Sequence, residues 1–229
     1  MENNSMNYEV RLSKAQDKLN ISKMIYEIYA KELGQYGLNE DQNIIDKYHD
    51  TNNYLVVYDK EELVGMVSIT IPSMGQISTL NRLPNDHEIH HHIDDIAEVR
   101  LLSIKKEYRS KGIYKLIIFK VMQFCDLYNI HRILISAISN KKDMYELMGF
   151  KQISVAVTEG NCCYIPMQLL RKDFCESPYY KILDGLRLYE KSRNKITIIS
   201  LSLKSILNAK VIQISINTAF KKLKKAIIK

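Results

Sequence analysis

The segment 96–128 constrains the fold of this chain more than any other. Its first part, Ile96–Ile104, is largely apolar and predicts a strand, and an apolar pattern with helical spacing runs from Gly112 to Tyr128. Only a short basic turn separates the two. A strand that leads through a tight turn directly into a helix is typical of folds in which helices cover a sheet, so the segment predicts a layered architecture.

The rest of the chain predicts elements of both kinds. Strands are expected at 8–13, 53–58, 63–71, 96–104, 132–138, 150–157 and 163–170, and helices at 15–33, 41–49, 112–128, 141–148 and 179–191. A polar connector is expected from Pro72 to about Asp95. This order predicts a mixed α/β or α+β fold with a central sheet of six or seven strands flanked by helices.

The positive charge of the chain is concentrated at one end. The 229 residues carry a net charge of +7, yet residues 191–229 alone contain ten Lys or Arg and no Asp or Glu. Subtracting +10 from +7 leaves −3 for the first 190 residues. We therefore expect a domain at 1–170 and an extension at 171–229 with a basic end. Because the main body is mildly acidic, no nucleic acid is expected as a partner.

The cysteines and the first residues indicate a reducing setting. Cys162 and Cys163 are adjacent and no CxxC pair exists, so neither a metal knuckle nor a disulfide framework is expected. The first residues are polar and lack the apolar core of a signal peptide. The uncharged runs of the tail, 196–203 among them, are too short to span a bilayer. We expect a cytoplasmic protein that its basic tail could hold at the periphery of a membrane.

One motif competes for a different function. The run HEIHH places His87, Glu88 and His91 in the HExxH spacing, which on a helix would hold zinc. Pro84 precedes the run closely and a strand is expected from Ile96, so the available helix has two turns at most. Zinc-binding helices of this kind are long and buried. The run is therefore expected to be a solvated connector, and no metal is expected.

The basic turn suits a phosphate-binding site. The first turn of a helix exposes N–H groups without intrahelical partners, and its dipole favours anions. Gly112 would let the backbone approach a ligand closely, while Arg109 and Lys111 add positive charge. The spacing matches neither the GxxxxGK[ST] loop nor the GxGxxG fingerprint. The turn therefore predicts a diphosphate cradle of another kind.

Together with its neighbours, this turn resembles the signature of the GNAT-fold N-acyltransferases. That signature is Arg or Gln, two residues, Gly, one residue, then Gly or Ala, and here it reads Arg109-Ser110-Lys111-Gly112-Ile113-Tyr114. The preceding strand resembles the family's fourth strand, and MYELMGF at 144–150 resembles its Tyr-x-x-x-Gly-Phe element. The element order agrees over roughly residues 7–170. Tyr114 departs from the small residue, and its N–H can serve only if its side chain turns away.

The resemblance implies the donor and the class of acceptor. The donor would be acyl-CoA or acetyl-CoA, or the phosphopantetheine of an acyl carrier protein, and the acceptor a small-molecule or peptide amine. In these folds the pantetheine arm pairs with the fourth strand as an extra strand, for which Leu102, Ser103 and Ile104 would supply the edge. The thioester would then point into a gap between strands 97–104 and 133–138.

A narrower resemblance concerns one branch of the family. The long polar connector before the fourth strand, and the run CYIPMQLL at 163–170, are similar to the N-acyl amino acid synthases. That branch is related to autoinducer synthases and uses long acyl chains on acyl carrier protein. The Ser-Arg-Leu run expected in its fourth strand is replaced here by Val99-Arg100-Leu101.

Two residues are candidates for the chemistry that the resemblance implies. Glu98 matches a catalytic Glu of several family members and would accept the proton of the attacking amine, directly or through a water. A structural salt bridge with Arg100 or another cation is the alternative for Glu98. Tyr145 matches the Tyr whose hydroxyl lies near the sulfur and would protonate the leaving thiolate. Packing as a core tyrosine is its alternative.

These observations predict an acyltransferase that moves an acyl group from a pantetheine thioester to a primary amine. The alternative from another class is a catalytically silent binding module of the same fold that acts through its basic tail. Residues 214–229 combine apolar positions at helical spacing with lysines. They could bind an acidic carrier protein or an anionic membrane, or simply pack on the body.

Overall fold

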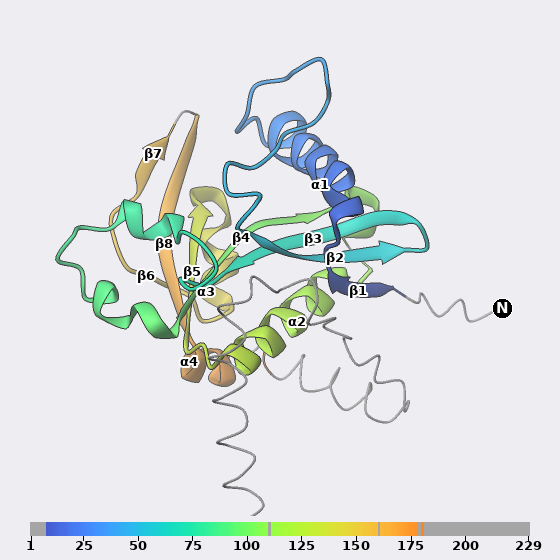
Figure 1. Cartoon of the computed structure of the whole chain (residues 1–229). Helices are drawn as coiled ribbons and strands as arrows, with labels where there is room; N and C mark the ends of the chain where they lie inside the picture. The colour runs from blue at the N-terminus through green and yellow to red at the C-terminus, as the bar shows by residue number, and fades with distance from the viewer. Residues whose placement is uncertain (1–7, 110, 160, 178–179, 181–229) are drawn as a thin grey trace, which may run out of the picture. The chain divides into compact units, whose positions relative to one another are not determined.

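The computed structural model describes residues 8–109, 111–159, 161–177 and 180, and the statements below concern these residues. Their central feature is a single mixed sheet (Figure 1). Its strands are β1 (Glu9–Leu12), β2 (Asn53–Asp59), β3 (Glu62–Thr70), β4 (Ile96–Ile104), β5 (Arg132–Ile138), β6 (Lys151–Gln152), β7 (Val157–Glu159) and β8 (Cys162–Leu170). The spatial order is β1-β2-β3-β4-β5-β8-β6, with β7 also paired to β8. Every pairing is antiparallel except β4–β5.

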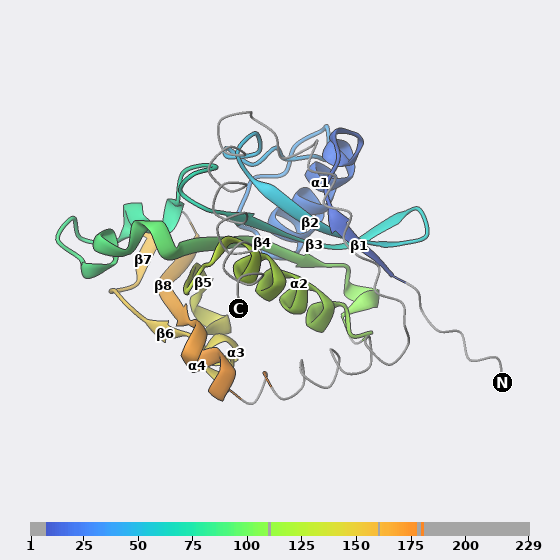
Figure 2. The ribbon, with the colours of Figure 1, turned by 60° about the horizontal axis from the view of Figure 1, so that its bottom comes forward.

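Helices cover both faces of this sheet, as Figure 2 shows for α1 and α2. The helices are α1 (Lys18–Ile25), which continues as a π-helical segment η2 (Tyr26–Glu32), α2 (Ile113–Tyr128), α3 (Lys142–Leu147) and α4 (Arg171–Glu176). Alternate residues of β2 serve the two faces, because Leu55 and Val57 pack on the α2 side while Val56 packs with α1. Burial on both faces explains why β2 and β3 are almost continuously apolar.

Several sequence predictions are confirmed. The strand predicted at 96–104 has those bounds, and the helix predicted at 112–128 begins one residue later because Gly112 is its N-cap. The connector contains two short 3₁₀ helices, η3 (Ser78–Arg82) and η4 (Glu88–Asp95). The predicted helix at 179–191 lies outside the described residues except for Tyr180.

The helix predicted at 41–49 was wrong, because this segment forms turns instead. The carboxylate of Asp46 accepts hydrogen bonds from the Tyr48 backbone N–H and from Asn52 Nδ2, and it forms an ion pair with Arg100 at 2.8 Å. These bonds fix a turn around a buried acid. A regular helix would leave this acid on a helical surface and away from the strand that carries Arg100.

The sheet has eight strands rather than six or seven, because the segment predicted as one strand at 150–157 forms two short ones. Pro166 of β8 accepts a hydrogen bond from the Ile153 N–H at 3.0 Å but has no N–H to donate in return. The ladder on this side of β8 is therefore interrupted between β6 and β7.

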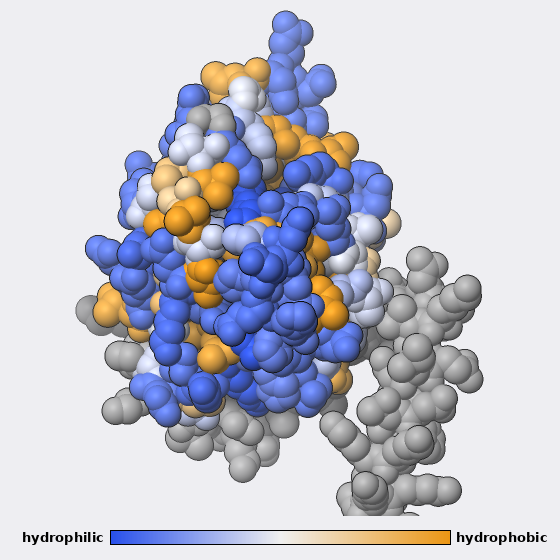
Figure 3. All heavy atoms as spheres, turned by 90° about the vertical axis from the view of Figure 1, so that its left-hand side faces the viewer, coloured by the Kyte–Doolittle hydropathy of each residue, from blue (hydrophilic) through white to orange (hydrophobic). Residues whose placement is uncertain are grey.

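Hydrophobic side chains on the surface are dispersed. Figure 3 shows one face, on which hydrophobic residues form separate small patches among hydrophilic ones. Large exposed apolar side chains of the described residues include Leu38, Ile45, Leu147 and Val155. Single exposed apolar side chains are normal for a folded domain, so this pattern by itself marks no interface.

One close contact positions the start of α2. A Cβ built on Gly65 of β3 would lie 2.9 Å from Ile113 Cγ2 and 3.4 Å from Ile117 Cδ1. Both isoleucines are fully buried. The missing side chain at Gly65 therefore lets the first turn of α2 lie directly on β3, and with it the basic turn that precedes the helix.

We predict that Gly65→Ala destabilises the fold by about 1–3 kcal/mol, since the methyl group would displace α2 from β3. Urea denaturation measures the free energy of unfolding. Gly37→Ala is the matched control, because nothing lies within 4 Å of a Cβ at that position. Equal stability of the two variants would show that α2 can move away at little cost.

Candidate active site

The site begins where β4 and β5 separate. Their parallel pairing covers only Ile96–Glu98 against Arg132–Leu134. Beyond it β4 carries a bulge, because Met66 pairs with Ser103 while Ser68 pairs with Arg100, so Val67 faces two residues of β4. Leu101 lies in this bulge with a φ of 54°, in the left-handed region that a leucine rarely adopts. Bulges of this kind re-aim side chains and end pairing, and they are frequent beside active sites.

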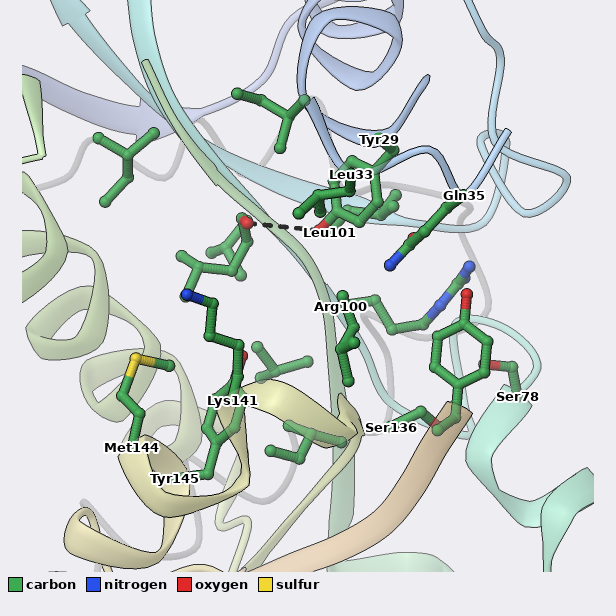
Figure 4. Close-up of a pocket in the computed structure, with 18 of the residues that line it drawn as sticks. Tyr29, Leu33, Gln35, Ser78, Arg100, Leu101, Ser136, Lys141, Met144 and Tyr145 are labelled. Carbon is green, nitrogen blue, oxygen red and sulfur yellow. Dashed lines mark hydrogen bonds between the residues drawn. The ribbon is translucent and has the colours of Figure 1, made fainter. Parts of the chain in front are cut away.

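A cavity of about 930 Å³ includes this opening, and its walls differ in chemistry. The apolar wall is formed by Val67, Ile118, Val121, Met122, Ile133, Ile135, Met148, Phe150, Leu169 and Phe174. The polar lining includes Gln35, Tyr36, Asp46, Ser78, Arg82, Arg100, Ser136, Glu159 and Tyr164. In Figure 4, Met144 and Tyr145 lie on one side of β4 and Ser78 and Arg100 on the other. The cavity therefore extends along both sides of β4.

The predicted cradle lies beside the cavity. Gly112 has a φ of 82°, a conformation that favours glycine, and it is followed by the buried Ile113 at the start of α2. Arg109 lines the cavity, and its Nε donates to the Ile104 carbonyl at 3.0 Å. The Lys111 ammonium lies 4.3 Å from the centre of the Tyr108 ring. Ser110 lies outside the described residues.

Tyr114 also lines the cavity, and its side chain extends from α2 to α3, where its hydroxyl lies 2.5 Å from Met148 Sδ. The side chain contributes to the cavity wall.

The residues predicted to pair with the pantetheine arm do not all face the same side of β4. The Lys105 N–H donates to the Val64 carbonyl of β3, so the backbone groups of Ser103, two residues earlier, also face β3. The Ser103 side chain is buried and donates to the Leu101 carbonyl. Leu102 and Ile104 line the cavity, and their carbonyls accept from the Tyr29 hydroxyl and from Arg109. The accessible edge therefore consists of Leu102 and Ile104.

Glu98 is enclosed. It is 1% exposed, and its carboxylate accepts four hydrogen bonds from the backbone N–H groups and the hydroxyls of Ser78 and Thr79, at 2.5–2.8 Å. Arg100 pairs with Asp46 instead, and within the described part of the chain Glu98 forms no salt bridge with Arg100 or another cation. Ser78 lines the cavity. Glu98 therefore reaches the cavity through hydroxyl groups.

Tyr145 lines the cavity on the same side of β4 as Met144 (Figure 4). Its ring packs edge-on against Phe150, with the ring centres 5.6 Å apart. Burial raises the pKa of the Tyr145 hydroxyl, so the group keeps its proton at neutral pH and remains a proton donor.

Several residues of the cavity stand in no sequence motif, among them Tyr29, Arg82 and Lys141. Tyr29, on the π-helical segment, donates to the Leu102 carbonyl at 3.3 Å (Figure 4). Arg82, from the connector, donates through Nη1 to Ser136 Oγ and through Nε and Nη2 to the carboxylate of Glu159. Lys141 lines the cavity from the turn before α3. Tyr29 follows the helical spacing of a core residue, and the other two end short 3₁₀ helices, so no local pattern marked them.

The HExxH run forms no metal site in the part of the chain that is described. His87 Nε2 lies 2.9 Å from the Ile153 carbonyl, and its Nδ1 accepts from the Ile89 N–H. His90 Nε2 lies 3.1 Å from the Pro84 carbonyl. Both rings are thus occupied by backbone partners, and the described residues contain no group of three or more potential ligands.

A family model described as an acetyltransferase (GNAT) domain matches residues 36–171. The chain belongs to this family. The GNAT fold predicted from the basic turn and its neighbours is thereby confirmed, and acyl transfer is the general chemistry of the family. No curated protein sequence gives a significant match.

Solved structures with this fold include an N-acyl amino acid synthase and an acyl-homoserine lactone synthase. FeeM, an N-acyl amino acid synthase from uncultured soil microbes, is similar with a TM-score of 0.60 and 15% identity over 77% of this chain and 98% of that chain. The CoA-dependent acyl-homoserine lactone synthase BjaI has a TM-score of 0.57 and 12% identity over 78% and 90%. A GNAT acetyltransferase from Staphylococcus aureus Mu50 has 0.51 and 15% over 72% and 99%. At these identities the likeness shows the fold.

The predicted extension falls mostly outside the described residues, including all of 181–229. Its docking role and the boundary at residue 170 therefore remain predictions. In the described part of the chain, no helix is long and apolar enough to cross a bilayer.

We predict that Gly112→Asp abolishes measurable binding of acyl-CoA, because it places a negative charge at the turn where the diphosphate is expected. The fold should survive, since nothing lies within 4 Å of a Cβ there and Asp tolerates a positive φ better than most residues. Isothermal titration calorimetry measures the affinity and circular dichroism the fold. Gly112→Ala introduces the backbone strain without the charge. Unchanged binding by Gly112→Asp would contradict the cradle assignment.

Proposed function

We propose that this protein is an N-acyltransferase that moves an acyl group from a pantetheine thioester to a primary amine. The observation that carries the proposal is the cavity at the β4–β5 opening. It is lined by the part of β4 beyond its pairing with β5, by the Tyr145 phenol and by polar side chains. The donor would be acyl-CoA or the phosphopantetheine of an acyl carrier protein. Its pantetheine arm would pair with Leu102 and Ile104, and its phosphates would lie at the first turn of α2.

The apolar wall favours a donor whose acyl chain is longer than acetyl. Ile118, Val121 and Met122 of α2 face the cavity together with Phe150 and Leu169 from beyond β5. Each methylene group that such a wall removes from water contributes about 0.8 kcal/mol to binding. An acetyl group would contact only a small part of this apolar wall.

The polar wall favours an acceptor that is a small amine with a further charged group. Arg82 and Arg100 both line it, and each is paired with an acid, Glu159 and Asp46 respectively. Burial opposes the charge of Arg100, but Asp46 and Glu98 together raise the pKa of the guanidinium. A wall with both charges in close pairs suits a zwitterionic acceptor, whose amine and carboxylate find partners of opposite sign.

The hydroxyl groups around Glu98 supply a path for the amine proton. In the proposed step the amine nitrogen attacks the thioester carbon, the C–N bond forms and the C–S bond breaks. The amine proton passes to Ser78 Oγ, whose own proton passes to Glu98 Oε1 at 2.8 Å. Thr79 Oγ1, 3.0 Å from Ser136 Oγ, offers a second path. Tyr145 gives its proton to the leaving thiolate.

Mass spectrometry of ligand retained by the purified protein, together with thermal shifts in free CoA, acetyl-CoA and longer acyl-CoAs, tests the proposal. Larger shifts with longer acyl chains would support the donor assignment. A donor that binds but is never transferred to any amine would favour the alternative of a silent binding module.

We predict that Tyr145→Phe lowers turnover by roughly 10²–10⁴-fold with little change in donor affinity, because it removes only the hydroxyl that protonates the thiolate. Single-turnover kinetics measures the chemical step. Tyr128→Phe is the matched control, since Tyr128 is a partly buried tyrosine of α2 outside the cavity lining. Equal turnover of Tyr145→Phe and the parent would make Tyr145 a packing residue.

We predict that Ser78→Ala lowers turnover by at least 10-fold and flattens the alkaline-rising limb of the pH–rate profile, because the shorter proton path to Glu98 is lost. Its backbone N–H still donates to Glu98, so stability should change little. Glu98→Gln should show the same kinetic effect and also lower the free energy of unfolding by about 1–3 kcal/mol, since an amide NH₂ would face hydrogen-bond donors. Ser154→Ala, outside the cavity lining, is the control. A pH–rate profile unchanged by both variants would exclude Glu98 as the proton acceptor.

A further inference from the structure

On the side of the cavity where the donor is proposed to bind, an ion pair occupies the arginine of the predicted cradle. Glu32, the last residue of the π-helical segment, lies with its Oε2 2.5 Å from Arg109 Nη2, and both residues line the cavity. Arg109 is also held through Nε by the Ile104 carbonyl, at 3.0 Å. The guanidinium of the predicted cradle is thus fixed in direction, and a carboxylate already occupies its outer face.

Other cations surround the same carboxylate. The hydrogen bond from Arg109, its charge and the charges of Lys106 and Lys141 lower the pKa of Glu32, although partial burial opposes them. Lys106 comes from the turn after β4 and Lys141 from the turn before α3, so three separate segments direct positive charge to one point. Figure 4 shows Lys141 on the donor side of the cavity, beside Tyr145. A position surrounded by these three cations is suited to bind an anion, and it is called the phosphate seat below.

We propose that Glu32 is an internal counterion that occupies the seat of a donor phosphate, and that the donor must displace it from Arg109 in order to bind. The inference rests on the proposed function, because it assumes a phosphate-bearing pantetheine donor. It also assigns Lys141 to the phosphate site, as a third cation beside Arg109 and Lys106. Glu32 thus sets the affinity for the donor and for the free CoA that is released as product.

The exchange is physically accessible. The side chains of Glu32 and Arg109 are 38% and 41% exposed, and exposed ion pairs of this kind are weak and screened by salt. A diphosphate carries more charge than one carboxylate, so it competes effectively for three cations. The displaced carboxylate stays attached to the chain near the phosphates and repels them. Glu32 therefore weakens binding of phosphate-bearing ligands and favours product release.

Binding of free CoA and of pantetheine to the full chain tests this inference. Glu32→Gln keeps the shape of the side chain and removes its charge. We expect CoA to bind about 3- to 10-fold more tightly to this variant, with a smaller gain at high salt. Pantetheine has no phosphate and should bind with unchanged affinity. Lys141→Gln should weaken CoA binding and leave pantetheine binding unaffected.

Glu27→Gln is the matched control. Glu27 lies on the same segment, is exposed and forms an ion pair with Lys31 at 3.0 Å. It should leave CoA affinity unchanged. Equal or weaker CoA binding by Glu32→Gln would overturn the inference and make Glu32 a residue that positions Arg109. An equal gain for pantetheine would also overturn it. Absence of CoA binding in every protein would instead refute the CoA donor of the proposed function, and the phosphate seat with it.

Discussion

Parallel pairing between β4 and β5 ends after three residue pairs, and the rest of the site depends on that early end. A sheet that stayed paired would bury the edges of both strands in hydrogen bonds and leave no passage through its middle. The bulge at Leu101 turns β4 away, so Leu102 and Ile104 present backbone groups to the cavity. Apolar side chains of α2 then line one side of the opening, and polar side chains of the connector and of the strand ends line the other.

The sequence predicted the parts of this arrangement that rest on local pattern. The strand at 96–104 and the helix after Gly112 follow from hydrophobic periodicity and from the conformational freedom of glycine, both of which are local properties. The turn around Asp46 could not be predicted, because it depends on an ion pair with Arg100, 54 residues away in the chain. Pro166 could be seen in the sequence, but its effect on the sheet depends on which neighbouring strand its missing N–H would face.

The residues of the candidate site likewise divide into those that a local motif marks and those that it does not. Arg109, Gly112 and Tyr145 stand in motifs, and they were found because the spacing of a motif is preserved in the sequence. The partners of Glu98 lie about 20 residues upstream in a polar connector, and nothing in that connector distinguished Ser78 and Thr79 from other hydroxyl residues. Tyr29 and Glu32 were assigned to an ordinary helix, whereas the π-helical winding directs them to β4 and to the basic turn.

That winding has a consequence for how this chain tolerates changes in length. A π-helical turn holds about one residue more than an α-helical turn, and successive residues of an α-helix are about 100° apart around its axis. Deleting one residue within Tyr26–Glu32 would let the segment relax into a shorter, regular helix, because the wide winding has poorer backbone geometry. The relaxation would absorb the deleted residue, so the chain that follows would leave the helix on nearly the same side. The directions of Tyr29 and Glu32 would change instead, because the wide winding sets them. Loss of a single residue here would therefore alter the cavity while the connection to the next segment stays in place.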